Sequence, residues 1–485
     1  MNPYRVGRSR DYVGARHASP LQPKIQNSKL PLKHLAVIGL AFLFLEGCAT
    51  FSQNMVPVRD SLIAGDIPKA VADFKKISAG KDDLLHMLQQ GYLSQLSGDW
   101  LDSNNAFDAA EKRYEELYTV SISNEVFSLL TSDNSRPYRS NEQEMALIPY
   151  YRIFNYLQLG KADDAMVEAR KANDKHKVDL TQTEKMGERD IRFKAFLNYY
   201  TGLLFASRGE NNDAIVSLRT AFKLYRLGNT KFSLPVPRWL PADYYDAAIQ
   251  VGLKDEVRRL SDPYPEIAAM ASKNHHNNVI LFLESGFVPY REGIDIFLPI
   301  LKTDDDKEAA KTYYKKYGGD IYAYQARPPK LDQFLRISYP KLTMFPSAVA
   351  SMKVVLPNGE SLSTERGLNL GIETDLQFKQ DSGDILLRTF IRTLAKQGTL
   401  KSAQDSSKGL GDLMNIFNVA TEQADTRSWL LLPERIDLVK ASVPAGTASL
   451  TVKFLDADGN VVEEKQVPVN PQAHGLQWIT VRCFK

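Results

Sequence analysis

Cys48 is the residue whose type and position suggest chemistry most directly. Its thiol follows Gly47 and the eleven-residue apolar run Leu35–Leu45, which contains no charged residue. A basic segment precedes the run, and a basic segment, a short apolar segment and a small residue before a cleavage point are typical of a secretory signal. Eleven residues are too few to span a bilayer, which takes about 20. The sequence predicts that residues 1–47 are a signal removed before Cys48.

The ending Leu45-Glu46-Gly47-Cys48 resembles a bacterial lipobox, where a diacylglyceryl group is transferred to the thiol. The lipid would then anchor the protein to a membrane. Glu46 departs from the small or apolar residue that a lipobox carries there, so cleavage near Ala49 with loss of Cys48 is the alternative. The long basic segment also allows translation to begin near Leu30 or Leu32.

Two further segments carry side chains suited to binding or to buried pairing. Tyr138 and Arg139 end the segment Val120–Arg139, and Tyr and Arg often dominate the energy of protein interfaces. We expect them to bind a partner; the alternative is that Arg139 caps a helix and Tyr138 fills the core.

The second segment, Ala424–Trp429, is expected to be structural. In it Arg427 pairs with Asp425 or Asp437, and Trp429 packs a helical insertion onto a sheet.

The sequence lacks the spacing of familiar catalytic and metal centres. It has no Gly-x-Ser-x-Gly, no P-loop and no His-Glu-x-x-His, and its Ser-x-x-Lys match at Ser78–Lys81 lies in an expected loop. We expect no enzyme, catalytic residue, cofactor, metal or small-molecule substrate. Residues 1–47 hold seven of the 61 Lys and Arg and two of the 58 Asp and Glu, which leaves 54 basic and 56 acidic residues. This balance argues against a nucleic-acid partner.

The N-terminal half repeats one helical pattern. Each repeat has a Gly after an apolar helical run. Mostly small or apolar residues follow at positions five, nine and twelve after this Gly. A Gly fits the left-handed turn that ends the first helix of a pair, and small residues let the two helices approach closely. The pattern resembles tetratricopeptide repeats and predicts an all-α solenoid over residues 48–260, although the spacing is uneven. The glycines are Gly65, Gly98, Gly160 and Gly209, with a degenerate turn at Gly252.

The C-terminal half changes to the period of strands. Val279–Leu283 is too short an apolar run for a helix, and Ser449–Leu455 alternates between apolar and polar residues. We expect a β-sandwich-like domain of antiparallel strands over residues 276–485. A helical insertion at 375–423 interrupts it, as two helices, Asp375–Lys396 and Leu410–Gln423, with a Gly/Ser/Lys-rich link between them. The fold class is therefore α+β.

Several longer segments resemble an uncharacterised family of bacterial outer-membrane lipoproteins with tetratricopeptide-like repeats. The resemblance covers nearly all of the chain after the signal, and it implies a setting in the cell envelope without implying an activity. The segments are Asp133–Arg139, Tyr150–Gly160, Val167–Asn173, Val279–Gly286, Ala424–Trp429 with Leu432-Pro433, and Pro444–Gly446.

These observations favour a non-catalytic scaffold or adaptor. It would be held by lipid at the periplasmic face of the outer membrane and would bind envelope proteins through its helical repeats. One alternative is a cell-wall glycan-binding or hydrolytic module in the C-terminal half, which an exposed aromatic row on a sheet would favour. Another is an accessory subunit of a secretion or surface-polymer machine.

The lipid anchor gives a first prediction. Cells supplied with an alkyne fatty acid should label the wild-type protein and the Cys483→Ser variant, but not Cys48→Ser, because Cys48 provides the acceptor thiol. The label is read by click chemistry after purification. Equal labelling of Cys48→Ser and wild type would show that the lipid is not attached through this residue.

Overall fold

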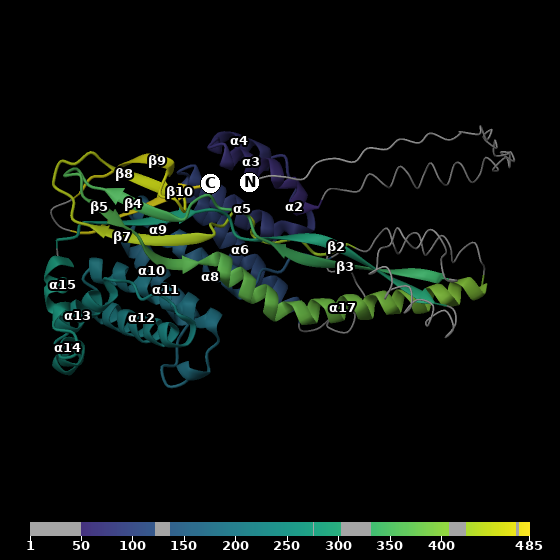
Figure 1. Cartoon of the computed structure of the whole chain (residues 1–485), viewed down its shortest axis with the longest axis horizontal. Coiled ribbons are helices and arrows are strands. Elements are labelled where there is room, and N and C mark those ends of the chain that lie inside the picture. Colours follow the sequence, from purple (N-terminus) through teal and green to yellow (C-terminus); the bar gives the residue numbers. More distant parts are fainter. Residues whose placement is uncertain (1–49, 122–135, 275, 302–330, 407–422, 472–474) are drawn as a thin grey trace, which may run out of the picture. The chain divides into compact units, whose positions relative to one another are not determined.

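A computed structural model describes residues 50–121, 136–274, 276–301, 331–406, 423–471 and 475–485 (Figure 1). The predicted signal, Cys48, most of Val120–Arg139 and almost all of the predicted helix Leu410–Gln423 lie outside these residues. Helices occupy the N-terminal half and sheets the C-terminal half. The prediction that the chain is mixed α and β, with the helical part first, is therefore confirmed. None of the described helices is both long enough and apolar enough to cross a membrane.

The described residues up to Asn274 form helices joined by short turns. Short 3₁₀ turns occur at Gly80–Asp82 and Thr183–Lys185. The helices are α2 Phe51–Asn54, α3 Val56–Ile63, α4 Ile67–Phe74, α5 Asp83–Leu96, α6 Trp100–Ser121, α8 Glu142–Ala146, α9 Ile148–Gln158, α10 Ala162–Lys175, α11 Glu188–Ser207, α12 Asn211–Phe232, α13 Leu240–Gln250, α14 Lys254–Ser261 and α15 Glu266–Asn274.

The predicted turn glycines join these helices in pairs. Each of the five adopts a positive φ, between 71° and 80°, which a residue with a Cβ reaches only with strain. The turns at these positions are therefore confirmed. They join α3 to α4, α5 to α6, α9 to α10, α11 to α12 and α13 to α14.

Small residues allow the two helices of a pair to touch. Ala165 and Ala214, at the predicted offset of five, are completely buried. A second contact recurs in two pairs, where a glycine seven residues before the turn faces the residue nine after it. A Cβ on Gly91 would lie 2.6 Å from a ring carbon of Phe107, and one on Gly202 would lie 2.8 Å from Cγ of Leu218. Close packing thus demands glycine at both positions.

The C-terminal half contains two four-stranded sheets and a separate hairpin. The first sheet has the order β10-β1-β7-β6 and the second has the order β5-β4-β8-β9, while β2 pairs with β3. The helix α17 (Leu370–Ser406) runs along β3 (Figure 1). The strands are β1 Val279–Ser285, β2 Tyr290–Leu301, β3 Leu331–Thr343, β4 Ser351–Val355, β5 Ser361–Ser363, β6 Glu365–Asn369, β7 Arg435–Ala441, β8 Ser449–Leu455, β9 Val461–Pro468 and β10 Gln477–Cys483.

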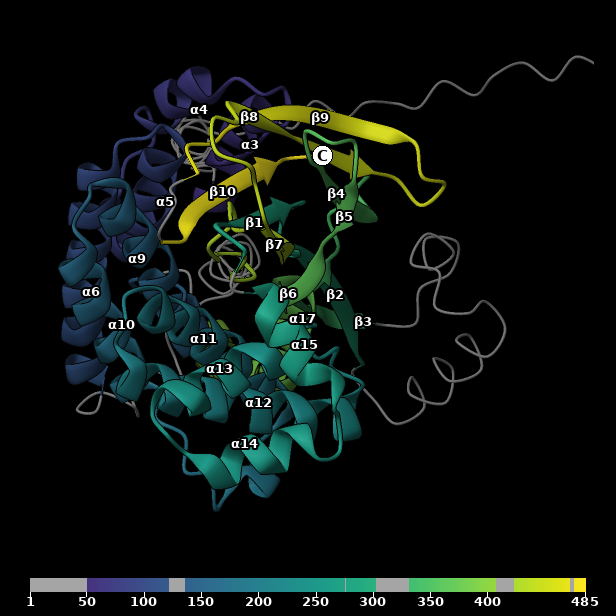
Figure 2. The same cartoon turned by 90° about the vertical axis from the view of Figure 1, so that its left-hand side faces the viewer.

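Strand β1 is buried on both faces, which explains its unbroken apolar sequence. Val279, Leu281 and Leu283 pack against the second sheet, in one hydrophobic cluster. Ile280 and Phe282 point the other way and belong to the cluster formed by the helices. The first sheet therefore lies between the second sheet and the helices. Figure 2 shows the helix pairs following one another in an arc around it.

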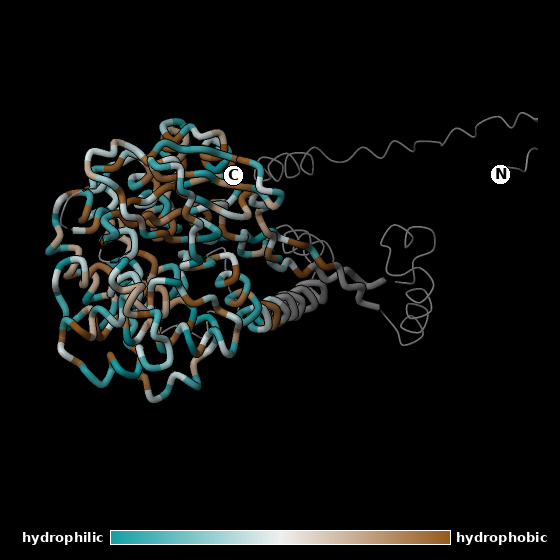
Figure 3. Tube along the Cα trace, turned by 60° about the vertical axis from the view of Figure 1, so that its left-hand side comes forward, coloured by the Kyte–Doolittle hydropathy of each residue, from teal (hydrophilic) through white to brown (hydrophobic). Residues whose placement is uncertain are grey.

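The same packing appears in the hydropathy of the chain. Along most of the described chain, hydrophobic and hydrophilic residues interchange at short intervals (Figure 3). Such patterning is what elements with one buried side require. Residues Thr50–Lys485 form one compact unit. That residues 48–260 and 276–485 are two separate domains stays a prediction.

Two predictions about the C-terminal half are wrong. Strands β1 and β10 pair in parallel, from Val279 with Gln477 to Ser285 with Cys483, although antiparallel strands were expected. Parallel pairing needs a long connection, and almost the whole C-terminal half supplies it. The predicted link after Lys396 is also helical as far as Ser406, because a single glycine, Gly398, does not outweigh the helix-forming residues around it.

The close helix contact gives a prediction with an internal control. Gly202→Ala should destabilise the protein by about 1–3 kcal/mol, because the added methyl group overlaps Leu218. Gly383→Ala in α17, where no atom lies within 4 Å of the added Cβ, should instead stabilise by about 0.5–1 kcal/mol. Urea unfolding followed by circular dichroism measures both. If Gly202→Ala were as stable as Gly383→Ala, the close contact between α11 and α12 would be refuted.

Candidate functional site

The structure brings together the two segments singled out in the sequence. Glu144 in α8 joins them. Its Oε2 accepts hydrogen bonds from the hydroxyls of Tyr138, at 2.5 Å, and Ser140, at 2.7 Å, and its Oε1 accepts one from the backbone N–H of Trp429, at 2.9 Å. A carboxylate buried with three donors fixes the relative position of segments almost 300 residues apart in the chain.

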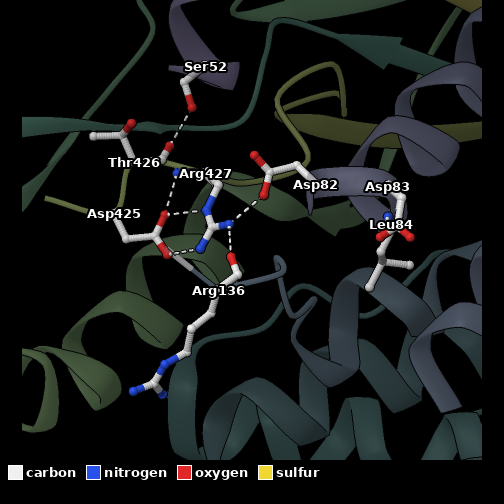
Figure 4. Close-up of polar contacts among 8 residues, drawn as sticks. All are labelled: Ser52, Asp82, Asp83, Leu84, Arg136, Asp425, Thr426 and Arg427. Carbon is white, nitrogen blue, oxygen red and sulfur yellow. Dashed lines mark hydrogen bonds and ion pairs between the residues drawn. The ribbon is translucent and has the colours of Figure 1, made fainter. Parts of the chain in front are cut away.

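Arg427 forms the second junction. Its Nε and Nη2 donate to the two oxygens of Asp425, at 2.8 and 2.7 Å, in a bidentate pair. Its Nη1 donates to Asp82 and, at 2.7 Å, to the backbone carbonyl of Arg136 (Figure 4). The predicted pairing of Arg427 is thus with Asp425, while Asp437 lies 3.3 Å from Arg435.

The charges of this junction hold one another in the ionised form. Burial alone would raise the pKa of Asp425, but the hydrogen bonds and charge of Arg427 outweigh it and leave that pKa lowered. Burial disfavours the charged Arg427 as well, yet Asp425 and Asp82 raise its pKa. A lowered carboxyl pKa stabilises the fold above the pKa of the unfolded chain, and this stabilisation is lost as the pH falls through the folded pKa.

Trp429 is fully buried, in the hydrophobic cluster formed by the helices. Its ring lies 5.8 Å from that of Phe107 in α6 and 6.0 Å from that of Tyr151 in α9. It therefore packs against the helical half, and it also lines a small cavity with Glu373, Thr374 and Gln377 of α17. Whether it packs the helical insertion onto a sheet stays a prediction. Local sequence predicts that the indole ring of a tryptophan is buried, but it does not predict which residues surround the ring.

The predicted partner-binding pair is divided between the core and the surface. Tyr138 is only 6% exposed, as the alternative interpretation expected, so little of its side chain can reach a partner. Arg139 is exposed. Whether Arg139 binds a partner stays a prediction.

A pocket of about 240 Å³ opens beside this junction. Residues from four parts of the chain line it: the segment before α8, the hairpin β2–β3, α17, and the segment before Trp429. We call it the arginine pocket. Its described lining is Arg136, Pro137, Tyr138, Arg139, Asn141, Arg291, Ser338, Pro340, Asp381, Ile385, Arg388, Thr389, Gln423, Ala424, Asp425 and Arg427.

The lining is strongly cationic, with five arginines and two aspartates. Arg427 is neutralised by its aspartates, but neither Arg291 nor Arg388 has a carboxylate within 4.0 Å in the described part of the chain. Arg388 is exposed, and among the described residues its guanidinium donates to the backbone carbonyl of Asp384, at 3.3 Å. Guanidinium groups bind carboxylates and phosphates through paired hydrogen bonds, so the pocket suits an anionic group.

This convergence of arginines has little signature in the sequence. Arg136, Arg291 and Arg388 lie on three separate elements and belong to no short motif, so only the fold places them together. No group of three or more His, Cys, Asp or Glu suited to a metal ion occurs within the described ranges.

Comparison with known proteins assigns no family. The sequence matches no protein-family model, and a search of curated proteins gives no match. The resemblance to outer-membrane lipoproteins therefore stays a prediction.

The buried pairing of Arg427 gives a stability prediction. Arg427→Gln should lower the free energy of unfolding by about 3–5 kcal/mol at pH 7, because it leaves the carboxylates of Asp425 and Asp82 without their cation. Arg258→Gln is the matched control. Arg258 pairs with Asp255 on the surface of α14, and its loss should cost no more than about 0.5 kcal/mol.

Equilibrium unfolding in urea compares the two variants with wild type. Equal stabilities of Arg427→Gln and Arg258→Gln would contradict a structural role for the Arg427 junction.

Proposed function

We propose that the protein is a non-catalytic, lipid-anchored adaptor of the bacterial envelope whose arginine pocket receives an acidic segment of a partner protein. The observation that carries the proposal is the lining of the pocket, where Arg291 and Arg388 have no carboxylate partner among the described residues. A carboxylate entering the pocket would form charge-assisted hydrogen bonds, which are about twice as strong as neutral ones.

The start of the described chain supports a position of the pocket close to the lipid. Helix α2 begins with a capping box at Thr50, and the hydroxyl of Ser52 donates to the carbonyl of Thr426 at 2.8 Å (Figure 4). Ser52 is the fourth residue after Cys48, a reach of about 14 Å at most. A lipid on Cys48 would therefore hold the pocket near the membrane and raise its effective concentration toward membrane-bound partners.

The inner face of the helices is a less suitable partner surface. Tyr150 and Tyr200 on that face pack against Phe282 of β1, and Tyr200 also packs against Trp478 of β10. The protein's own sheet covers the surface that a solenoid would offer. We retain the tetratricopeptide-like solenoid, the β-sandwich-like arrangement, the lipoprotein family and the periplasmic face of the outer membrane as parts of the proposal.

Nothing specific favours the alternative functions. A glycan-binding module would be supported by a row of exposed aromatic side chains on a sheet. Among the residues whose exposure the structure describes, which leaves out parts of β2 and β3, the exposed large aromatics are Tyr118 and Tyr264, and neither belongs to a strand. An accessory role in a secretion or surface-polymer machine would differ from an adaptor only in its partner.

Binding of a fluorescent hexaglutamate peptide tests the proposal. The double variant Arg139→Gln/Arg388→Gln should bind the peptide at least tenfold more weakly, because each lost hydrogen bond between charged groups contributes about 1.5–3 kcal/mol. Both residues are exposed, so the fold should be unaffected. Fluorescence anisotropy at fixed salt gives the affinities.

The control is Arg226→Gln/Arg258→Gln, which removes two exposed arginines of the helical half. It keeps the net charge equal to that of the test variant. If both double variants lost affinity equally, the binding would reflect overall charge and the assignment of the pocket would fail.

A further inference from the structure

A smaller cavity lies next to the arginine pocket and shares Asn141 and Arg291 with it. Its volume is about 50 Å³, room for a few atoms rather than a large ligand. Glu373, in the first turn of α17, lines it together with Ser428 and Trp429. We call it the Glu373 cavity.

Polar atoms of these lining residues lack hydrogen-bond partners. Glu373 is 4% exposed, and neither of its carboxyl oxygens has a partner within the described structure. The same holds there for the hydroxyl of Ser428 and for Nε1 of Trp429. Buried polar groups are hydrogen-bonded in the great majority of cases, so four unpaired atoms around one cavity can hydrogen-bond a small polar ligand.

The unpaired donors and acceptors determine the chemistry of a ligand that would complete their hydrogen bonds. An ionised Glu373 offers two acceptors and a negative charge. Trp429 and Ser428 offer donors, and Arg291 adds a positive charge on the same cavity. A ligand that carries a cation with several N–H donors beside an anion with several acceptors matches both sets. The ammonium and carboxylate groups of an α-amino acid have this combination within five heavy atoms.

We propose that the Glu373 cavity binds the ammonium and carboxylate groups of an α-amino acid, either free or as part of a larger molecule. The ammonium group pairs with Glu373, and the carboxylate accepts from Trp429, Ser428 and Arg291. The side chain of the ligand extends toward the arginine pocket, which adjoins the cavity at Asn141 and Arg291. This proposal does not rest on the acidic partner segment proposed above, although both sites use Arg291.

The electrostatics of Glu373 supply a measurable consequence. Burial raises its pKa to about 8, although Arg192 and Arg189 of α11 act to lower it. Glu188 and Asp190 of α11 raise it further, and Arg291 and Glu144 are the other charged groups on the cavity. At pH 7 Glu373 is therefore mostly protonated without a ligand. An ammonium group stabilises the ionised carboxylate, so its binding releases close to one proton.

Calorimetric titration of the full-length protein with glycine at pH 7 tests the site. Two buffers with different ionisation enthalpies report the number of protons released. We expect saturable binding with release of close to one proton. Methylammonium and acetate, each carrying one of the two charged groups, should bind at least tenfold more weakly. No binding of glycine, binding without proton release, or equal binding of methylammonium would each overturn the proposal.

Variants separate this site from its neighbour. Glu373→Gln should weaken glycine binding at least tenfold, whereas Glu360→Gln, at an exposed position, should leave it unchanged. Circular dichroism and the unfolding midpoint establish that Glu373→Gln is folded. Arg388 lines only the arginine pocket, so Arg388→Gln should also leave glycine binding unchanged. Unchanged binding in folded Glu373→Gln would refute the assignment, and the acidic-peptide proposal would be unaffected.

Discussion

The burial of a charged residue, Glu284, at the junction of helices and sheet is the constraint on which the rest of the structure depends. Glu284 lies near the end of β1 and is 1% exposed. Its carboxyl accepts hydrogen bonds from the hydroxyls of Tyr92, at 3.0 Å, and Tyr150, at 3.2 Å, on helices α5 and α9. Burial raises the pKa of Glu284, and the charge of Arg482, 3.9 Å away on β10, acts in the opposite direction.

Arg482 extends the same network. Its Nε donates to the hydroxyl of Tyr92 at 2.9 Å, and its other nitrogens donate to the carbonyls of Cys483 and Gly286. Groups of this kind are tolerated in a core only when their partners are in place, so helices and sheet must be assembled together. A second buried pair repeats the arrangement, since Lys440 of β7 donates to Asp243 of α13.

The candidate site follows from this union of the two halves. Its lining comes from the segment before α8, from the hairpin, from α17 and from the segment before Trp429, and none of these alone forms a pocket. Arg427, through its ion pairs, and Glu144, through its hydrogen bonds, fix the segments in place. Arg291 and Arg388 have no carboxylate partner among the described residues and are the groups proposed to bind a ligand. Arginine thus serves both the structural junction and the proposed binding surface, and what distinguishes the two is whether a carboxylate lies nearby.

What the sequence predicted well is what local chemistry determines. A glycine after an apolar run can end a helix without strain, so all five turns of the helix pairs were correctly placed. The run Val279–Leu283 was correctly assigned to a strand because it is too short for a buried helix. The pairing of Arg427 was narrowed to two aspartates, one of which is its partner.

What the sequence missed depends on contacts between distant residues. The parallel pairing of β1 with β10 joins strands almost 200 residues apart, and the neighbours of Trp429 lie about 280 and 320 residues away. Tyrosine is a residue type that is common at interfaces, but the fold buries Tyr138, whose hydroxyl donates to Glu144. The arginine pocket could not be predicted for the same reason. Residue type and spacing along one segment do not show which remote segment will lie opposite.

The central claim is that helices and sheets form one cooperative unit, and native-state hydrogen exchange in increasing urea tests it most directly. The account predicts that the core amides of α5 and α9 share one free energy of opening with those of β1 and β10. Opening of the helices would take the hydroxyls of Tyr92 and Tyr150 from Glu284, and opening of the strands would leave those buried hydroxyls without their acceptor. The contradicting result is exchange of β1 and β10 at urea concentrations where α5 and α9 remain fully protected.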